Sequence, residues 1–119
     1  MFLDYKQVNH LFIVCGKTDL RKGIDGLASI VQHEYQLDVY DNALFLFCGG
    51  RQDRFKMLYY DKDGFLLLYK RLEQGKFIWP RSESEVQELN SQQFRWLMEG
   101  LTISPKKSVQ PVSSPEFIA

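Results

Sequence analysis

The chain has few cysteines and no long apolar run, and these absences exclude several classes of protein. Its two cysteines, Cys15 and Cys48, show no paired spacing, so a disulfide-stapled secreted domain is not expected and the composition suits a reducing cytoplasm. No apolar stretch approaches the ~18 residues of a membrane-spanning helix. Residues 1–10 lack the basic start and apolar run of a signal peptide. We therefore expect a cytoplasmic protein without a membrane segment.

The chain also lacks net charge, since 15 basic residues balance 15 acidic ones. The balance excludes a histone-like cationic protein, but not a local basic patch, because binding depends on how the charges are distributed. A length of 119 residues with 45% hydrophobic residues fits one domain with its own core. We predict a single domain over residues 1–103 and a disordered tail, rich in Ser and Pro, over residues 104–119.

The first third of the chain predicts a strand followed by a helix. Residues 8–14 are rich in bulky and β-branched side chains, which favour a strand. Thr18 or Asp19 can cap a helix that extends to about Tyr35, and the alternative is a later start marked by Gly23 and Gly26. Apolar residues of this segment recur at spacings of four, three and four, which is the pattern of one buried helix face. They are Leu20, Ile24, Leu27 and Val31.

The middle of the chain predicts an antiparallel β-meander of about four strands on which this helix packs. Short apolar or alternating segments are separated by turn sequences such as Asp61-Lys62-Asp63-Gly64. The expected strands cover residues 44–50, 54–60, 65–72 and 76–80. Residues 86–89 can add a short strand, and Ser91 can cap a short C-terminal helix over residues 92–99. The expected fold class is α+β.

Pairing across the predicted turns gathers basic side chains at one end of the sheet. Lys56 falls near Lys70, Arg54 falls near Arg71 or Leu72, and Tyr69 falls near Trp79. Like charges opposed across strands cost on the order of a few tenths of a kcal/mol per pair. An anionic ligand explains such a cluster, with Arg and Lys on phosphates and aromatic rings stacked on bases. The alternative is internal neutralisation by three carboxylates, those of Asp25, Asp53 and Glu73.

Signs of catalysis or of metal binding are weak. Asp61 and Asp63 flank a hairpin tip, where Asp is the ordinary turn residue, so a metal-dependent nuclease built on converging carboxylates is a minor alternative. The histidines and cysteines have no zinc-ligand spacing, and no nucleophile motif is recognisable. We expect no enzyme activity, no catalytic residue, no metal and no cofactor.

Several segments together carry a family resemblance. Residues 18–27 read TDLRKGIDGL, residues 69–73 read YKRLE and residues 77–80 read FIWP, in an order and spacing that span roughly residues 10–103. The combination resembles the TnpB-type accessory protein encoded by the second open reading frame of the sixty-six family of bacterial insertion sequences. The chain departs from that family at Tyr59, Tyr60 and Tyr69, where Trp is frequent. The resemblance implies an accessory role in transposition beside a separate, larger DDE-type transposase.

The residues and the resemblance together lead to one main hypothesis. We expect the protein to bind DNA, and in particular the ends of the insertion sequence, through a basic patch on the sheet. The candidate contacts are Arg21, Lys22, Arg51, Arg54, Lys56, Lys70, Arg71, Tyr69 and Trp79. The alternative is a protein–protein adaptor that docks on the element's transposase without contacting DNA itself.

Overall fold

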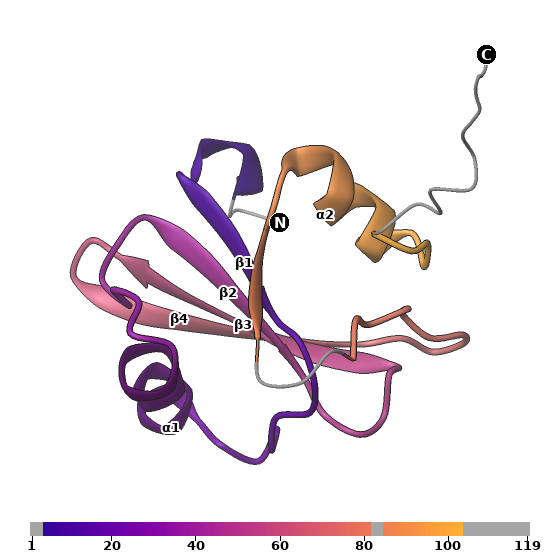
Figure 1. Ribbon diagram of the computed structural model, residues 1–119, viewed down its shortest axis with the longest axis horizontal. Helices are drawn as coiled ribbons and strands as arrows, with labels where there is room; N and C mark the ends of the chain where they lie inside the picture. The colour runs from indigo at the N-terminus through magenta and orange to yellow at the C-terminus, as the bar shows by residue number, and fades with distance from the viewer. Residues whose placement is uncertain (1–3, 82–84, 104–119) are drawn as a thin grey trace.

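The computed structural model describes residues 4–81 and 85–103, and in this part five strands form one sheet with a helix on each face (Figure 1). The strand order is β4-β3-β2-β1-β5. The strands are β1 (His10–Val14), β2 (Ala43–Cys48), β3 (Arg54–Asp61), β4 (Gly64–Arg71) and β5 (Val86–Leu89). The helices are α1 (Ile24–Ser29), which continues as a π-helical turn η2 (Ile30–Glu34), α2 (Ser91–Met98) and a 3-10 turn η1 (Tyr5–Gln7). The α+β class is confirmed.

One face of the sheet packs against α1. Residues alternate between the two faces of a strand, so Val14, Phe45 and Leu58 share the face that α1 covers. Leu27 and Val31 of the helical segment are buried there, as the apolar periodicity predicts. Because the α1 connection returns the chain to the same end of the sheet, β1 and β2 pair in parallel.

The other face packs against α2 and against the extended segment that precedes β5. Phe94 and Leu97 of α2, together with Phe77 and Trp79, cover this face. Every residue of β2 is buried, because this central strand is covered on both faces. The sheet is therefore the middle layer of three (Figure 1).

The expected start of the first helix is corrected. The helix begins at Ile24 with Gly23 at its N-cap, and neither Thr18 nor Asp19 caps it. The Asp19 carboxylate instead accepts the backbone N–H of Arg21 at 3.0 Å, which is an Asx-turn. The Thr18 N–H donates to the Cys48 carbonyl at 2.8 Å, so this part of the chain is held against the end of β2. The end of the helical segment agrees with the prediction, since Tyr35 is its C-cap.

The fourth meander strand, expected over residues 76–80, does not form. The Phe77 N–H donates to the Gln52 carbonyl at 2.7 Å, and the Trp79 N–H donates to Oε1 of Gln52 at 3.0 Å. These bonds hold the segment over the sheet and not beside β4. The expected pairing of Tyr69 with Trp79 is therefore wrong, and β4 is an edge strand.

The β3–β4 hairpin forms as predicted, with a register that differs by one residue in part. Arg54 is paired with Arg71, as expected, but Lys56 is paired with Tyr69 and not with Lys70. The reason is the two-residue loop of Lys62 and Asp63, in which Lys62 takes a φ of 59°. Hairpin register follows from loop length, and one residue of error moves a side chain to the other face.

The C-terminal elements match the prediction except for the helix cap. β5 covers residues 86–89, and Gly100 ends α2 with a φ of 78°. The N-cap is Asn90 and not Ser91, and it forms a capping box with Gln93. No helix in the described part of the chain is long and apolar enough to cross a membrane. The predicted tail, residues 104–119, lies outside the described residues, so the domain boundary at 103 stays a prediction.

Candidate functional site

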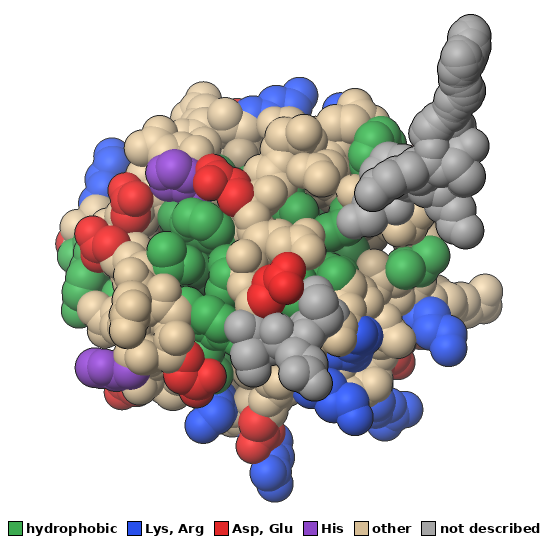
Figure 2. All heavy atoms as spheres, in the orientation of Figure 1, with side chains coloured by type: hydrophobic (Ala, Val, Ile, Leu, Met, Phe, Trp, Pro, Cys, Tyr) green, Lys and Arg blue, Asp and Glu red, His purple; other side chains and the backbone are tan. Residues whose placement is uncertain are grey.

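An open hollow of about 640 Å³ lies on the α1 face, at the end of the sheet where β3 begins. Its walls come from the loop after β1, the loop after β2, and neighbouring positions of β3 and β4. They are Thr18, Asp19, Leu20, Arg21, Gly49, Gly50, Arg51, Arg54, Lys56, Leu67 and Tyr69. Four of these side chains are cations and only one is a carboxylate, so we call this feature the basic hollow. Figure 2 shows Lys and Arg side chains gathered along the lower border of the molecule, around the loops after β1 and β2.

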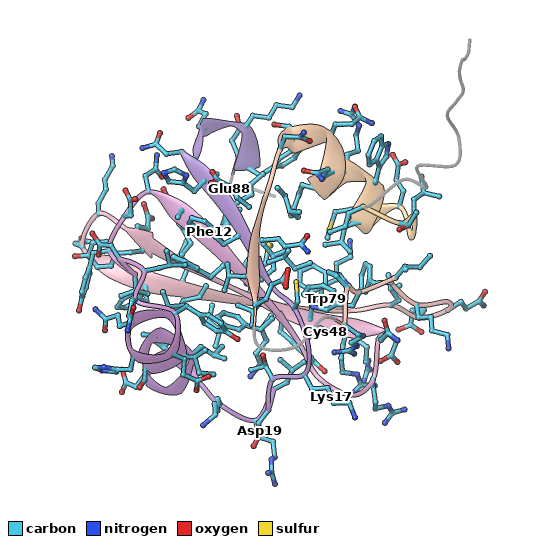
Figure 3. The ribbon with its side chains drawn as sticks, viewed as in Figure 1. Phe12, Lys17, Asp19, Cys48, Trp79 and Glu88 are labelled. Carbon is cyan, nitrogen blue, oxygen red and sulfur yellow. The ribbon has the colours of Figure 1, made fainter. Side chains whose placement is uncertain are left out.

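The first wall is built on the Asx-turn at Asp19. Nε and Nη2 of Arg21 donate to the two carboxylate oxygens of Asp19, each at 3.0 Å, in a bidentate ion pair. These bonds from the Arg21 side chain, with one from its backbone, lower the pKa of Asp19 to about 2. The carboxylate therefore remains charged at neutral pH and fixes the direction of Arg21. Figure 3 shows Lys17 and Asp19 on this loop, pointing away from the sheet.

The second wall is built on Arg54, the first residue of β3. Its Nε and Nη2 donate to Asp53 at 2.9 and 3.2 Å, and its Nη1 lies 3.5 Å from the Tyr69 hydroxyl. The bond from Arg54 lowers the pKa of Asp53, and the same bond raises the pKa of Arg54. Asp53 itself does not line the hollow. The guanidinium is thus held in place with Tyr69 beside it.

Lys56 joins the sheet to the helix side of the hollow. Its Nζ donates to the Lys22 carbonyl at 3.0 Å and lies 5.9 Å from the centre of the Tyr69 ring. A carbonyl and an aromatic ring orient an ammonium group without cancelling its charge. Lys56 therefore lines the hollow without an ion pair to any described carboxylate.

Arg81 clamps the two loops together. Its Nη1 donates to the Gly16 carbonyl at 2.7 Å, and its Nη2 donates to the Gly49 carbonyl at 2.6 Å. The same guanidinium lies 3.8 Å from the Cys48 sulfur, a buried thiol whose pKa is raised by burial. A Cβ at Gly49 would lie 3.2 Å from the Thr18 carbonyl oxygen, so a larger residue there would require this oxygen to move by a few tenths of an ångström. The loops that carry Arg21 and Arg51 are thus fixed relative to each other.

Comparison with known proteins gives the family. Residues 9–108 match the family described as IS66 Orf2 like protein. The chain belongs to the IS66 Orf2-like family. Two relatives from Sinorhizobium fredii (strain NBRC 101917 / NGR234) are similar to it. Uncharacterized protein y4hO is 34% identical over 91 residues, which cover 76% of this chain and 79% of that protein. Uncharacterized protein y4jC is 31% identical over 109 residues, which cover 92% of each. No solved structure matches the chain.

Family membership confirms the resemblance stated from the sequence, so this is an insertion-sequence-associated protein. The sequence blocks that carried the resemblance lie around the same hollow. Residues 18–21 form its first wall, Tyr69 belongs to its second, and the residue that follows the Trp-Pro pair is the clamp, Arg81. The sequence alone did not single out Arg81. Its position directly after the FIWP block was the available signal.

The structure brings together five of the nine predicted contact residues. They are Arg21, Arg51, Arg54, Lys56 and Tyr69. Arg71 lies next to this set, because it is paired with Arg54 across the hairpin. Lys22 contributes its carbonyl to Lys56, and its own side chain is exposed beside the hollow.

Two predicted contacts lie elsewhere. Lys70 follows Tyr69 in β4 and so faces the α2 side of the sheet, where it lines a separate apolar hollow. Trp79 is only 3% exposed and packs with Cys48 inside the molecule (Figure 3). Its indole Nε1 donates to the Val14 carbonyl at 2.9 Å. Trp79 is therefore a core residue whose ring is not open for stacking.

Internal neutralisation accounts for part of the cluster only. Asp53 pairs with Arg54, but Asp25 and Glu73 make no ion pair within 4.0 Å in the part of the chain that is described. Arg51 is exposed and makes no ion pair with any described residue. Across residues 4–81 and 85–103, no group of three His, Cys, Asp or Glu side chains is arranged to hold a metal ion.

Proposed function

We propose that the protein is a non-enzymatic accessory factor of transposition, which binds the DNA of its insertion sequence through the basic hollow. The observation that carries the proposal is the convergence of Arg21, Arg51, Arg54 and Lys56 on one open surface that a single carboxylate lines. Family membership supplies the context of a mobile element. The excess of positive charge on this surface favours a polyanion as the partner.

The arrangement suits phosphate groups in particular. Arginine offers a planar fork of donors that matches phosphate oxygens, and two of the arginines are already held in fixed directions by Asp19 and Asp53. Tyr69 is 52% exposed at the edge of the hollow, where its ring can lie against a sugar or an unstacked base. Contacts of this kind bind the nucleic acid backbone and carry little sequence information.

The test is a fluorescence-anisotropy titration with labelled duplex and single-stranded oligonucleotides from the element's ends, at several salt concentrations. Arg51→Gln is the most direct variant, because Arg51 has no ion pair among the described residues whose loss could disturb the fold. The slope of log K against log salt is negative, and each lost phosphate contact makes it less steep by about 0.9 for duplex DNA and about 0.7 for single strands. The form of DNA that the protein prefers follows from the same titrations.

The matched control is Arg95→Gln on α2. Arg95 is exposed like Arg51, but it lies on the helix that covers the opposite face of the sheet. The Arg95→Gln substitution removes the same charge as Arg51→Gln, so an effect of net charge alone would lower the DNA affinity of both variants. Equal loss of affinity in the two variants, or no binding by the wild type at low salt, contradicts the proposal.

The α2 side of the sheet favours a second candidate function, that of an adaptor for the transposase. An apolar hollow of about 430 Å³ lies between β3, β4 and α2, lined among others by Met57, Leu68, Phe94 and Met98. Apolar hollows of this kind are suited to a protein side chain more than to DNA. Co-purification with the transposase that survives nuclease treatment supports the adaptor, and loss of the complex on that treatment supports DNA as the link.

A further inference from the structure

Strand β4 is an open sheet edge whose two charged residues, Lys70 and Arg71, both lie at its C-terminal end. Among the described residues it pairs with β3 alone, over the eight residues Gly64–Arg71. Its register with β3 is continuous from Arg71 to Gly64, so no bulge bends it away, and it contains no proline. Proteins normally shield long, regular edges, because such an edge is a template for another strand. A regular edge strand of eight residues that is apolar over most of its length therefore points to a partner strand.

One backbone hydrogen bond next to β4 shows which backbone groups of the strand face outward. The Leu72 N–H donates to the Asp53 carbonyl at 2.7 Å, which makes this a bonded pair of the β3–β4 ladder. Bonded and non-bonded pairs alternate in an antiparallel ladder. The even-numbered residues of β4 therefore bond to β3, and the odd-numbered ones direct their N–H and C=O groups to the open edge. The outward residues are Phe65, Leu67, Tyr69 and Arg71.

The side chains along this edge are apolar on both faces. Phe65, Leu66, Leu67 and Leu68 are all only half-buried. Two of the large apolar side chains that stay exposed lie here as well. They are Tyr69, at 52% exposed, and Tyr40, at 57% exposed, whose ring packs 5.6 Å from that of Phe65. A strand laid along β4 would cover these groups.

We propose that a second copy of this chain pairs with β4, strand to strand and antiparallel, about a two-fold axis through Leu67. When two identical edge strands pair antiparallel in one sheet, the two-fold axis is perpendicular to the sheet. Each residue is then paired with a residue of the other copy whose side chain points to the same side of the sheet. With Leu67 at the axis, Phe65 of one copy faces Tyr69 of the other, and Leu66 faces Leu68. All the outward backbone groups of Phe65, Leu67 and Tyr69 are then bonded.

The charges select this register over its two neighbours. With the axis at Leu67, the exposed Asp63 of one copy faces Arg71 of the other, twice in the dimer. Among residues 62–71, which form the loop and β4, a shift to Leu66 would oppose the like charges of Lys62 and Lys70. A shift to Leu68 would leave Asp63 and Arg71 without an opposite charge across the axis. The hairpin is thus complementary to itself, with Asp63 at its closed end and Arg71 at its open end.

The dimer has a consequence for the basic hollow. An axis perpendicular to the sheet keeps the α1 face of both copies on the same side. The two hollows therefore open on one face of a continuous ten-stranded sheet, related by the two-fold symmetry that a DNA duplex backbone also has.

The test is sedimentation velocity of the full chain without DNA over a range of concentrations. The expected species has twice the 14.0 kDa of the chain. Asp63→Arg or Arg71→Asp alone turns two attractive contacts into repulsive ones and should weaken dimerisation about tenfold or more. The double variant restores the pairs and should restore the dimer. Lys6→Asp, an exposed lysine on η1, is the charge-matched control, and circular dichroism shows whether each variant is folded.

A second measurement locates the interface without any substitution. Amide hydrogen exchange at Phe65, Leu67 and Tyr69 should slow as the protein concentration rises, while the amides bonded to β3 remain protected throughout. A monomeric mass at every concentration overturns the proposal, as does a dimer that both single variants leave unchanged or that the double variant fails to restore. No DNA is present, so these outcomes are independent of the DNA-binding proposal.

Discussion

The clamp at Arg81 gives the prediction that most directly links stability to function. Arg81→Met keeps an unbranched apolar stem and removes the guanidinium. The two carbonyls of Gly16 and Gly49 then lose donors that lie at 2.7 and 2.6 Å. We expect a less stable protein in which the loops that carry Arg21 and Arg51 are no longer held together.

The magnitude follows from the two bonds. A hydrogen bond from a charged group contributes about 1.5–3 kcal/mol. Gly49 is buried, so its carbonyl loses the bond in full, whereas Gly16 is half-exposed and water can replace part of the loss. We therefore expect the free energy of unfolding to fall by about 2–3 kcal/mol.

Urea unfolding followed by tryptophan fluorescence measures this change, with Arg95→Met as a control on an exposed helix position. DNA affinity is measured under conditions in which the variant is fully folded. Because Arg81 holds the loops and does not line the hollow, its loss should weaken binding without changing the salt slope. Arg51→Gln should instead make that slope less steep.

Two results would refute this reasoning. A loss of stability below about 0.5 kcal/mol, the range of an ordinary surface substitution, would mean that the two carbonyls do not depend on Arg81. A reduced salt slope in Arg81→Met would mean that the guanidinium contacts phosphate directly, which would make it a contact residue and not a clamp.

Three further predictions test the fold. Leu27→Ala, at a fully buried position of α1, should lower the free energy of unfolding by about 2–5 kcal/mol in urea, and a smaller loss would place α1 away from the sheet. Asn90→Ala should cost about 1 kcal/mol and Ser91→Ala much less; the reverse order would restore Ser91 as the cap. The hydrogen bond that the His10 ring donates to the Glu88 carboxylate raises the pKa of His10 above 6.5, so the stabilisation from this pair is present below pH 6.5 and is lost as pH rises through the raised value. As the pH rises through the raised pKa of His10, the thermal midpoint of the wild type should fall more than that of His10→Gln. If the midpoints of the two proteins change with pH in parallel, the His10–Glu88 pair does not contribute to stability.

Predictions that rest on turn sequences and on apolar periodicity largely agree with the structure, whereas both predicted helix caps are wrong. The turn at residues 61–64 fixed the hairpin, and with it the approach of Arg54 to Arg71, because a two-residue loop leaves the chain little choice of direction. The spacing of Leu27 and Val31 marked the buried face of α1 for the same reason, since it depends only on the helical repeat. The gathering of cations at the start of β3 followed from the hairpin alone.

Predictions that needed distant contacts failed. Residues 76–80 were predicted as a fourth meander strand. In the structure the backbone N–H groups of Phe77 and Trp79 donate to Gln52, and both aromatic rings are buried in the core. Apolar composition gives a strand and a buried loop segment the same appearance. Trp79 was therefore expected at the surface, and its place in the core depends on the carbonyl of Val14, which is 65 residues away in sequence.

The sequence by itself determined the class of fold, the family and the end of the sheet at which the cations meet, because turns, periodicity and motif order are properties of neighbouring residues. Only the tertiary structure decided which face each cation occupies, since one residue of register separates Lys56 and Tyr69 on one face from Lys70 on the other. It also decided that β4 is left as an open edge and that Arg81 closes the loops. Both depend on residues that lie far apart along the chain and meet only once it has folded.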